Sequence, residues 1–247
     1  MERFSRLTQL IGSENLRLLS EKKITIVGLG AVGSFAAEAL ARCGIGHITL
    51  VDFDVIAQSN INRHIGALES TIGRPKVDVI GERIKGINPS CDVVRMDFFA
   101  HRETFDTIFN ETPDIIIDAI DSLGPKIELL SWAHERSIDI VSSMGAALRT
   151  DPSRIRIADI SETEVCPLAR NLRKYLRRRG ITGGITCVYS DENPADEGLR
   201  PPDRNNEEEM TAFIRGRERN ILGSYPVVTA LFGLYAAHAA LKKLIAL

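Results

Sequence analysis

Residues 23–54 read KITIVGLGAVGSFAAEALARCGIGHITLVDFD. The short apolar run Lys23–Val27 leads into a glycine turn, residues 32–43 have alanine-rich helical spacing, and His47–Val51 is a second apolar run. This order predicts a strand, a turn, a helix and a second, parallel strand. Such a unit is typical of the start of a doubly wound α/β sheet.

Three glycines in the turn, Gly28, Gly30 and Gly33, form the pattern G-x-G-x-x-G. Glycines at these spacings allow a tight turn, close approach of a phosphate to the backbone and close helix packing, with a helix N-terminus just beyond. Asp52 ends the second strand, where a carboxylate can bind ribose hydroxyls. The pattern predicts a nucleotide site but does not identify the nucleotide.

Strands and helices continue to alternate as far as residue 145. We expect strands at Asp92–Met96, 115–117 and 139–142, and helices at 74–88, 103–109 and 125–136. The alternation predicts a Rossmann-like, doubly wound α/β fold with a mostly parallel sheet.

The pattern changes after Gly145. A half-exposed strand is expected at 154–159, a helix at 167–179 that ends at Gly180, and an acidic, aperiodic loop at 191–209. We therefore expect a single domain over residues 1–247. Its nucleotide-binding half is residues 1–145, and residues 146–247 form a mixed C-terminal extension that faces the substrate.

Charge and cysteine content exclude several classes of protein. The chain has 31 basic and 33 acidic residues, so any nucleic-acid binding must come from a local patch. Its four cysteines include no C-x-x-C pair, which argues against a zinc site and fits a reducing cytosol. The charged N-terminus does not have the pattern of a signal peptide. We expect a cytoplasmic protein.

Residues 226–247 are apolar and nearly long enough to span a membrane. They contain His238, Lys242 and Lys243, and small residues dominate the stretch. We therefore favour a buried C-terminal helix packed on the sheet over a membrane anchor.

Four short motifs follow in order: Asp52-Phe53-Asp54, Ser59-Asn60-Ile61-Asn62-Arg63, Arg74-Pro75-Lys76 and Asp118-Ala119-Ile120-Asp121. With the glycine turn, they resemble the ubiquitin-activating-enzyme-like adenylating superfamily over most of residues 1–145. The resemblance implies an enzyme that uses ATP to adenylate a carboxylate, rather than NAD for redox chemistry. One departure is Ala31, where many members have glycine, and a methyl group is tolerated there if φ is negative.

The residue types fit adenylation. A carboxylate attacks the α-phosphorus in line and pyrophosphate leaves, so the site needs cations on the phosphates and a carboxylate-held Mg²⁺. We expect Arg63 and Lys76 to be catalytic cations and Asp121 to be catalytic as the metal ligand. The full expected set for ATP and Mg²⁺ is Arg6, Gly28, Gly30, Ala31, Gly33, Asp52, Asp54, Ser59, Asn60, Arg63, Lys76 and Asp121.

Each of these residues also has a plain structural explanation. Arg63 could form a surface ion pair, Lys76 could be a solvated first-turn residue, and Asp121 could cap a helix before Pro125. Their joint occurrence at these spacings favours the functional interpretation.

Arg3-Phe4-Ser5-Arg6 resembles the N-terminal segment of the same superfamily, in which an arginine reaches the nucleotide of the partner subunit. By position that arginine is Arg6. The resemblance therefore implies a two-fold symmetric homodimer. The alternative is a chain end with incidental charges.

Later motifs resemble one branch of the superfamily over nearly the whole chain. They are Ile140-Val141-Ser142-Ser143-Met144-Gly145-Ala146-Ala147, Asp151-Pro152, Pro167-Leu168-Ala169-Arg170, Cys187-Val188-Tyr189-Ser190 and Phe232-Gly233. The branch is the tRNA threonylcarbamoyladenosine dehydratase family. The resemblance implies activation of the threonyl carboxylate of threonylcarbamoyladenosine in tRNA, followed by closure to the cyclic form. No catalytic cysteine or zinc is then needed. A monovalent-cation site and a sulfur-transfer protein partner are left open.

A basic stripe fits an RNA substrate. In a helix over 167–179, five side chains share one face: Arg170, Arg173, Lys174, Arg177 and Arg178. A basic stripe on a nearly neutral protein is suited to phosphate contact. The alternative is a solvated helix paired with the acidic loop. A second basic cluster comprises Arg215, Arg217 and Arg219.

Three other functions stay open at this level. An activator of a ubiquitin-like or sulfur-carrier protein would bind an extended C-terminus in a groove rather than RNA on a stripe. An NAD-dependent oxidoreductase is supported by Asp52 alone. A nucleotide-sensing scaffold without catalysis would be favoured by loss of Arg63, Lys76 or Asp121. Cys187 is expected to be a buried strand cysteine rather than a nucleophile.

Overall fold

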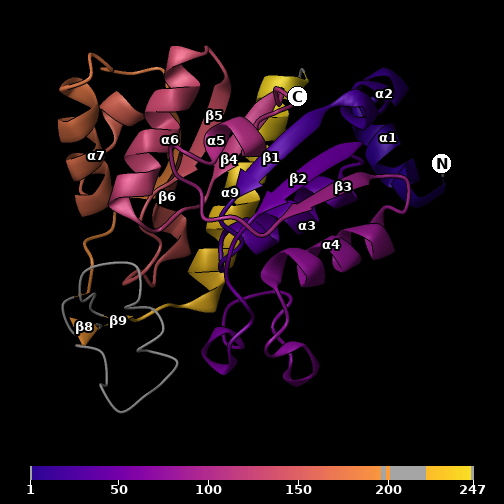
Figure 1. The fold of residues 1–247 in the computed structure, drawn as a ribbon, viewed down its shortest axis with the longest axis horizontal. Coiled ribbons are helices and arrows are strands. Elements are labelled where there is room, and N and C mark those ends of the chain that lie inside the picture. Colours follow the sequence, from indigo (N-terminus) through magenta and orange to yellow (C-terminus); the bar gives the residue numbers. More distant parts are fainter. Residues whose placement is uncertain (1, 196–198, 201–220, 246–247) are drawn as a thin grey trace.

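The structure is a computed structural model that describes residues 2–195, 199–200 and 221–245 (Figure 1). The α-helices are α1 Ser5–Ile11, α2 Ser13–Glu21, α3 Gly33–Arg42, α4 Lys76–Ile87, α5 Phe105–Ile108, α6 Leu123–Glu135, α7 Pro167–Arg177 and α9 Pro226–Leu244. Short 3₁₀ turns occur at Glu2–Phe4, Gln58–Asn60, Glu69–Thr71, Pro152–Arg154 and Ile160–Glu162.

Seven strands form one sheet in the order β3-β2-β1-β4-β5-β7-β6. They are β1 Lys23–Val27, β2 His47–Val51, β3 Asp92–Met96, β4 Ile115–Asp118, β5 Asp139–Ser143, β6 Ile155–Asp159 and β7 Thr186–Ser190. All neighbours pair in parallel except β6, which is antiparallel to β7. The predicted doubly wound, mostly parallel sheet is confirmed. A separate two-stranded ladder pairs β8 Leu199–Arg200 with β9 Ile221–Leu222.

The strand order reverses between β1 and β4, which pair side by side. In open α/β sheets, ligands bind outside the carboxyl ends of the strands at such a switch point. The glycine turn follows β1, and the segment containing Asp121 follows β4. The topology thus brings these two parts of the sequence together.

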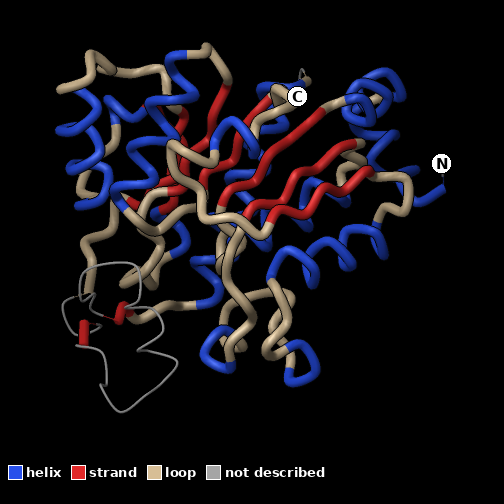
Figure 2. Tube along the Cα trace, viewed as in Figure 1, coloured by secondary structure: helices blue, strands red, loops and turns tan. Residues whose placement is uncertain are grey.

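Helices cover both faces of the sheet (Figure 2). One buried apolar core lies between the sheet and helices α3, α4 and α9, and the other lies between the sheet and helices α5, α6 and α7. The strands β1 and β4 are buried along nearly all their length, as expected for parallel strands covered on both faces.

Helix α9 crosses α3 at close range. A Cβ added at Gly233 would lie 2.3 Å from the carbonyl oxygen of Val32 and 2.8 Å from Cβ of Phe35. Within the described part of the chain, α9 alone is long and apolar enough to cross a membrane, and 50% of its most apolar window is buried in the fold. The expected packing of a C-terminal helix against the sheet is therefore observed.

Several features go beyond the predicted elements. Helices α1 and α2 were not predicted as elements, and β7 had no predicted bounds. The expectation that Cys187 is a buried strand cysteine is confirmed, because it lies at 0% exposure in β7. Arg215, Arg217, Arg219 and most of the acidic stretch 191–209 lie outside the described residues. The division at residue 145 stays a prediction, and the β5–β7 pairing makes the sheet continuous across it.

Candidate active site

The glycine turn after β1 is shaped by two positions that exclude a side chain. Gly28 has φ +90°, and a Cβ there would lie 2.8 Å from the carbonyl oxygen of Ala119. At Gly33, a Cβ would lie 1.8 Å from the carbonyl oxygen of Gly28. Gly30 has no such neighbour within 4 Å, so the turn opens to free space there. The turn is compact on its inner side and accessible on its outer side.

The N-terminus of α3 continues this opening. Its N-cap residue is Val32, and no side chain caps the helix. The N–H of Ser34 donates to the carbonyl of Gly30 at 3.1 Å, and the other N–H groups of the first turn can face an anion, as in phosphate sites. Ala31 is not among the non-glycine residues with positive φ in the described chain, so its methyl group is compatible with the turn.

Asp52 links the turn to the end of β2. Its Oδ2 accepts the N–H of Leu29 at 2.5 Å, and its Oδ1 accepts the N–H of Asp54 at 2.8 Å. Burial raises the pKa of Asp52, and the nearby charge of Lys76 opposes this rise. Each carboxylate oxygen keeps a further lone pair, which can accept a ribose hydroxyl.

Lys76 lies against the same carboxylates at the start of α4. Its Nζ is 2.8 Å from Oδ2 of Asp54 and 4.0 Å from Oδ1 of Asp52. The Lys76 N–H also donates to the carbonyl of Asp54 at 3.0 Å, beside a bridge between Val55 and Pro75. The residue is 8% exposed, so it is not the solvated residue of the plain explanation.

Arg63 is held by its own loop. Its Nη1 donates to the carbonyl of Ser59 at 2.6 Å and to Oδ1 of Asn62 at 2.8 Å. Among the described residues no carboxylate pairs with it, and burial lowers the pKa of this guanidinium. Asn60 Oδ1 accepts the N–H of Ala57 at 3.2 Å, which leaves its amide group free to orient a phosphate.

His64 is a site residue that sequence reasoning missed. It is 4% exposed, Nε2 lies 2.8 Å from the carbonyl oxygen of Leu29, and Nδ1 accepts the N–H of Gly66 at 3.0 Å. Because Nδ1 is an acceptor, the proton of the neutral ring is assigned to Nε2. Burial, followed by the charges of Lys76 and Arg63, lowers the pKa of His64 to about 4. The ring is therefore neutral at pH 7.

A buried ion pair supports the segment after β4. Lys126 Nζ lies 2.7 Å from Oδ2 of Asp118, and both side chains are fully buried. Lys126 also donates to the carbonyl of Ile120 at 2.9 Å, while Oδ1 of Asp118 accepts the Ile120 N–H at 3.1 Å. The N–H and the carbonyl of Ile120, the residue before Asp121, are thus both hydrogen-bonded to this ion pair.

Asp121 itself is exposed. The N-cap of α6 is Ser122, without a side-chain cap, so Asp121 does not act as the predicted alternative cap. The described residues contain no cluster of three or more His, Cys, Asp or Glu side chains that could hold a metal.

Arg6 lies apart from these motifs in the same chain. It is exposed on α1, which lies beside the amino ends of β1 and β2, whereas the nucleotide motifs follow the carboxyl ends (Figure 1). The chain therefore does not bring Arg6 to its own glycine turn.

The basic stripe on α7 divides into two parts. Arg170, Lys174, Arg177 and Arg178 are exposed. Arg173 instead donates to the carbonyl of Thr163 at 2.7 Å and to its hydroxyl. It borders the buried row formed by Ala169, Leu172 and Leu176, so its side chain turns inward. The expected five-residue face therefore has four exposed members.

The described acidic residues after β7 do not pair with α7. Asp191 forms ion pairs with Arg154 and Arg156, and Glu192 accepts N–H groups of Thr150 and Asp151. In the described residues the four exposed cations of α7 thus have no acidic partner.

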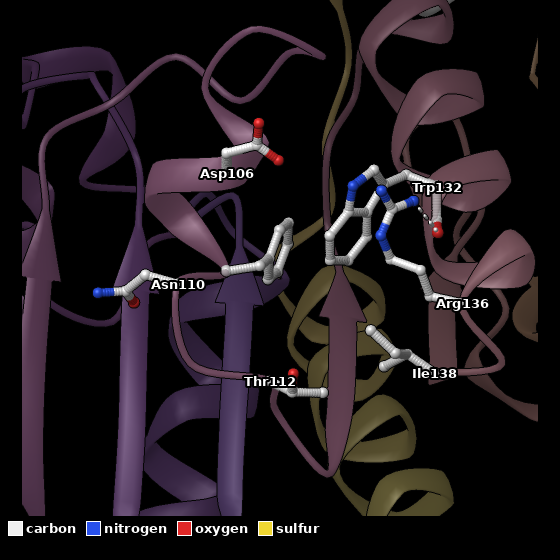
Figure 3. A pocket seen from close by; sticks show the side chains of 7 residues that line it. Asp106, Asn110, Thr112, Trp132, Arg136 and Ile138 are labelled. Atoms are coloured by element: carbon white, nitrogen blue, oxygen red, sulfur yellow. Dashed lines mark hydrogen bonds between the residues drawn. The ribbon is translucent and has the colours of Figure 1, made fainter.

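A cavity lies away from these motifs. It has a volume of about 410 Å³ and lies near the amino ends of β4 and β5, where Trp132 stacks on Phe109 and Arg136 lies over the indole (Figure 3). None of the nucleotide motifs lines it. Cys187 is also remote from solvent, and burial raises the pKa of its thiol, so it is a core residue.

The switch-point topology, the open glycine turn and the contacts of Lys76 with Asp52 and Asp54 define a nucleotide-binding fold of the ubiquitin-activating-enzyme-like kind. The chain belongs to the ThiF family, which matches residues 4–247.

Relatives within this fold point to one branch. The chain is 46% identical over 194 residues to tRNA threonylcarbamoyladenosine dehydratase of Bacillus subtilis, covering 78% of this chain and 76% of that protein. It is 37% identical over 259 residues to the Escherichia coli enzyme of the same name, covering 99% and 94%. A crystal structure of the E. coli enzyme in complex with ATP matches with a TM-score of 0.85 and 35% identity, over 98% of this chain and 93% of that one. The resemblance drawn from the motifs is confirmed.

Proposed function

We propose that this chain is an ATP-dependent tRNA threonylcarbamoyladenosine dehydratase. The observation that carries the proposal is the open glycine turn beside Asp52 and Lys76, in a fold that matches an ATP-bound dehydratase over 98% of the chain. The other motif residues follow the carboxyl ends of the neighbouring strands β2 and β4.

Each residue has a defined task in nucleotide binding. Gly30, Ala31 and Gly33 present backbone N–H groups to the phosphates, Gly28 forms the turn with its own N–H donated to the carbonyl of Val51, and Asp52 holds the ribose. Arg63 and Lys76 bind the phosphates, with Ser59 and Asp54 orienting these cations and Asn60 orienting the phosphates. Asp121 would hold Mg²⁺, which supplies positive charge to the phosphate oxygens.

The reaction has two steps. A threonyl carboxylate oxygen attacks the α-phosphorus of ATP, the bond to the β-phosphate oxygen breaks, and pyrophosphate leaves. A nucleophile within the same modification then attacks the acyl carbon, AMP leaves with that oxygen, and a proton is lost. Arg63 and Lys76 stabilise the charge that develops on the phosphates in the first step. Three of the four cysteines are buried and Cys43 is partly buried, which fits a reaction without a protein thiol.

The tRNA is proposed to lie along α7. This helix begins near the end of β5, since Cβ of Leu168 lies 4.0 Å from the position of a Cβ at Gly145. Its exposed cations therefore start near the carboxyl ends of the strands, where the nucleotide motifs lie. Phosphate groups of the anticodon arm would bind Arg170, Lys174, Arg177 and Arg178, while Arg173 supports the helix.

A homodimer completes the proposal. Arg6 is remote from its own glycine turn, so it can act only on the nucleotide of a partner subunit. The fold of the related enzymes and a reducing-cytosol cysteine pattern support a cytoplasmic protein.

One other activity is favoured by a specific observation. The chain is 28% identical over 170 residues to molybdopterin-synthase adenylyltransferase of E. coli, covering 69% of this chain and 64% of that protein. An adenylating activator of a protein C-terminus is therefore the second candidate. Its match is shorter and weaker than the match to the dehydratases.

Mass spectrometry of tRNA distinguishes the two candidates. Incubation of threonylcarbamoyladenosine-containing tRNA with the protein, ATP and Mg²⁺ should remove the mass of one water from the modified nucleoside. Omission of ATP should abolish the change. Formation of an adenylated sulfur-carrier protein without any change in the tRNA would favour the second candidate.

A further inference from the structure

The peptide units on both sides of Leu29 are held by two side chains from different parts of the chain. Asp52 accepts the Leu29 N–H at 2.5 Å, and His64 Nε2 lies 2.8 Å from the Leu29 carbonyl oxygen. Leu29 stands between Gly28 and Gly30, neither of which has a side chain to restrict the backbone. Without such bonds, the peptide planes of the turn could reorient.

The orientation of one plane matters for binding. In a trans peptide, a carbonyl and the following N–H point in opposite directions. The bond from His64 to the Leu29 carbonyl therefore directs the N–H of Gly30 away from the imidazole. Within the described chain this N–H has no hydrogen-bond acceptor, and Gly30 borders free space. A flipped plane would present a carbonyl oxygen to the phosphates instead.

The imidazole is itself fixed. Nδ1 accepts the N–H of Gly66 at 3.0 Å, and the hydroxyl of Thr71 donates to the carbonyl of Gly66 at 2.7 Å. A Cβ at Gly66 would lie 2.8 Å from Cγ1 of Val79 and 3.2 Å from Cε1 of His64, so the loop packs closely around the ring. His64 also directly follows Arg63 in sequence.

We propose that His64 is a positioning residue for the nucleotide: it fixes the Leu29–Gly30 peptide in the phosphate-binding orientation and ties the Arg63 loop to the glycine turn. The inference rests on the proposed binding of ATP at that turn. It assigns to His64 no contact with the substrate or with the reacting atoms.

Two substitutions separate the two hydrogen bonds of the ring. The amide of Asn can replace Nδ1, so His64→Asn keeps an acceptor for Gly66 and loses the donor to Leu29. The longer Gln can place its amide N–H near Nε2, so His64→Gln keeps the donor to Leu29 and loses the bond to Gly66. Both variants remove the imidazole, and thus each is the matched control of the other.

Calorimetric titration with ATP and Mg²⁺ measures the effect. We expect His64→Asn to raise the Kd for ATP on the order of 10-fold, because a preorganising hydrogen bond is lost. His64→Gln should stay within about threefold of the parent protein, since one neutral hydrogen bond remote from the ligand has a small effect. In steady-state assays His64→Asn should raise KM for ATP more than it lowers kcat.

Two results would overturn the inference. Unchanged ATP affinity in folded His64→Asn protein would show that the bond to Leu29 has no role in binding. Equal loss in both variants, in parallel with their melting temperatures, would show that the ring acts only by packing. If His64→Asn does not fold, His64→Leu, which removes the donor to Leu29 but fills the buried volume of the ring, should raise the Kd for ATP on the order of 10-fold, and unchanged affinity there would equally contradict the role.

Hydrogen exchange in nucleotide-free protein separates this inference from the proposed function. Loss of the His64 bond to the Leu29 carbonyl loosens the turn, so the Leu29 amide, whose acceptor is Asp52, should exchange faster in His64→Asn than in the parent or in His64→Gln, with the Val141 amide of β5 as an unaffected reference. If the three proteins show these exchange rates but the parent does not bind ATP, only the proposed function is refuted. Identical Leu29 exchange in all three proteins would refute the clamp alone.

Discussion

At the residue scale, the site is a set of charges held by backbone hydrogen bonds. Asp52 receives two N–H groups and Lys76 lies against two carboxylates, so the cation and the ribose-binding carboxylate fix each other. Arg63 is instead held by a carbonyl and an amide oxygen, which leave its positive charge uncompensated for a phosphate.

Loss of either cation should reduce turnover without unfolding the protein. Arg63→Ala and Lys76→Met should each lower kcat/KM on the order of 100-fold or more, because a charge that stabilises the transition state is removed. Lys22→Met is the matched control, since Lys22 forms an ion pair with Asp114 at the amino ends of β1 and β4, away from the nucleotide motifs. Normal turnover in both site variants, with circular dichroism unchanged, would contradict their assignment.

The buried imidazole gives stability a defined pH dependence. The folded-state pKa of His64 is about 4, below the ordinary value of 6.5, so between these values the unfolded chain binds a proton that the folded chain does not. Stability should therefore fall as pH decreases from about 7 to about 4, with a contribution from this group of up to about 3 kcal/mol. The neighbouring charges of Lys76 and Arg63 act in the same direction.

Urea unfolding between pH 4 and pH 7 measures this contribution. Because other groups also titrate in this range, the quantity that matters is the difference between the parent and His64→Gln, which has no titrating group at this position. The difference should change with pH in that window and be constant above it. A parallel pH dependence in both proteins would refute the assignment.

At the element scale, the helices and strands of residues 23–143 follow from hydrophobic periodicity and from glycine and proline positions. The N-terminal helices were missed because α1 has no buried residue and α2 has only Leu19. Strand β7 has a continuous buried run rather than an alternating one, since it lies between β5 and β6. Its role as a strand depends on tertiary neighbours.

Long-range contacts explain what the motifs could not reveal in the site. His64 and Leu29 are 35 residues apart in sequence, and only the folded crossover loop joins them. The pair Asp118–Lys126 spans a strand end and a helix, and Lys126 has no motif of its own. The direction of Arg173 likewise depends on the packing of α7 against residues 160–163. Periodicity placed it beside the exposed cations but could not show which way its side chain turns.

The basic helix α7 should bind tRNA and not ATP. Replacing Arg170, Lys174 and Arg177 by Gln should weaken tRNA binding and reduce its salt dependence by roughly one logarithmic unit per lost phosphate contact, with ATP affinity unchanged. Filter binding over a range of salt concentrations provides the slope. Arg154→Gln with Arg156→Gln, just before β6 and on it, is a control that removes two charges away from α7. If the triple variant binds tRNA like the parent at every salt concentration, α7 is a solvated face.

At the scale of the whole molecule, the switch point between β1 and β4 places the nucleotide motifs at the carboxyl ends of the strands. The basic helix begins near the carboxyl end of β5, while Arg6 lies beside the amino ends of β1 and β2. The single chain therefore accounts for nucleotide and RNA surfaces but leaves Arg6 without a role in its own site.

Subunit complementation tests the proposed role of Arg6 in a dimer. Arg6→Ala and Lys76→Met proteins should each be weakly active alone. After subunit exchange, a mixed dimer contains one site with both Arg6 and Lys76 intact, so about a quarter of the parent activity should return, since half of the dimers are mixed and each has one intact site of two. No recovery in a verified mixed dimer, or a strictly monomeric active enzyme in light scattering, would contradict action across the interface.

Oxygen transfer from a labelled threonyl carboxylate shows whether this carboxylate is activated by adenylation. The tRNA would carry ¹⁸O in the threonyl carboxylate, and the products of a reaction with ATP would be analysed by mass spectrometry. Attack of the carboxylate on the α-phosphorus, followed by loss of AMP from the acyl carbon, predicts one ¹⁸O atom in the phosphate of AMP. Appearance of ¹⁸O in inorganic phosphate with ADP as the other product, or AMP without label, would contradict adenylation.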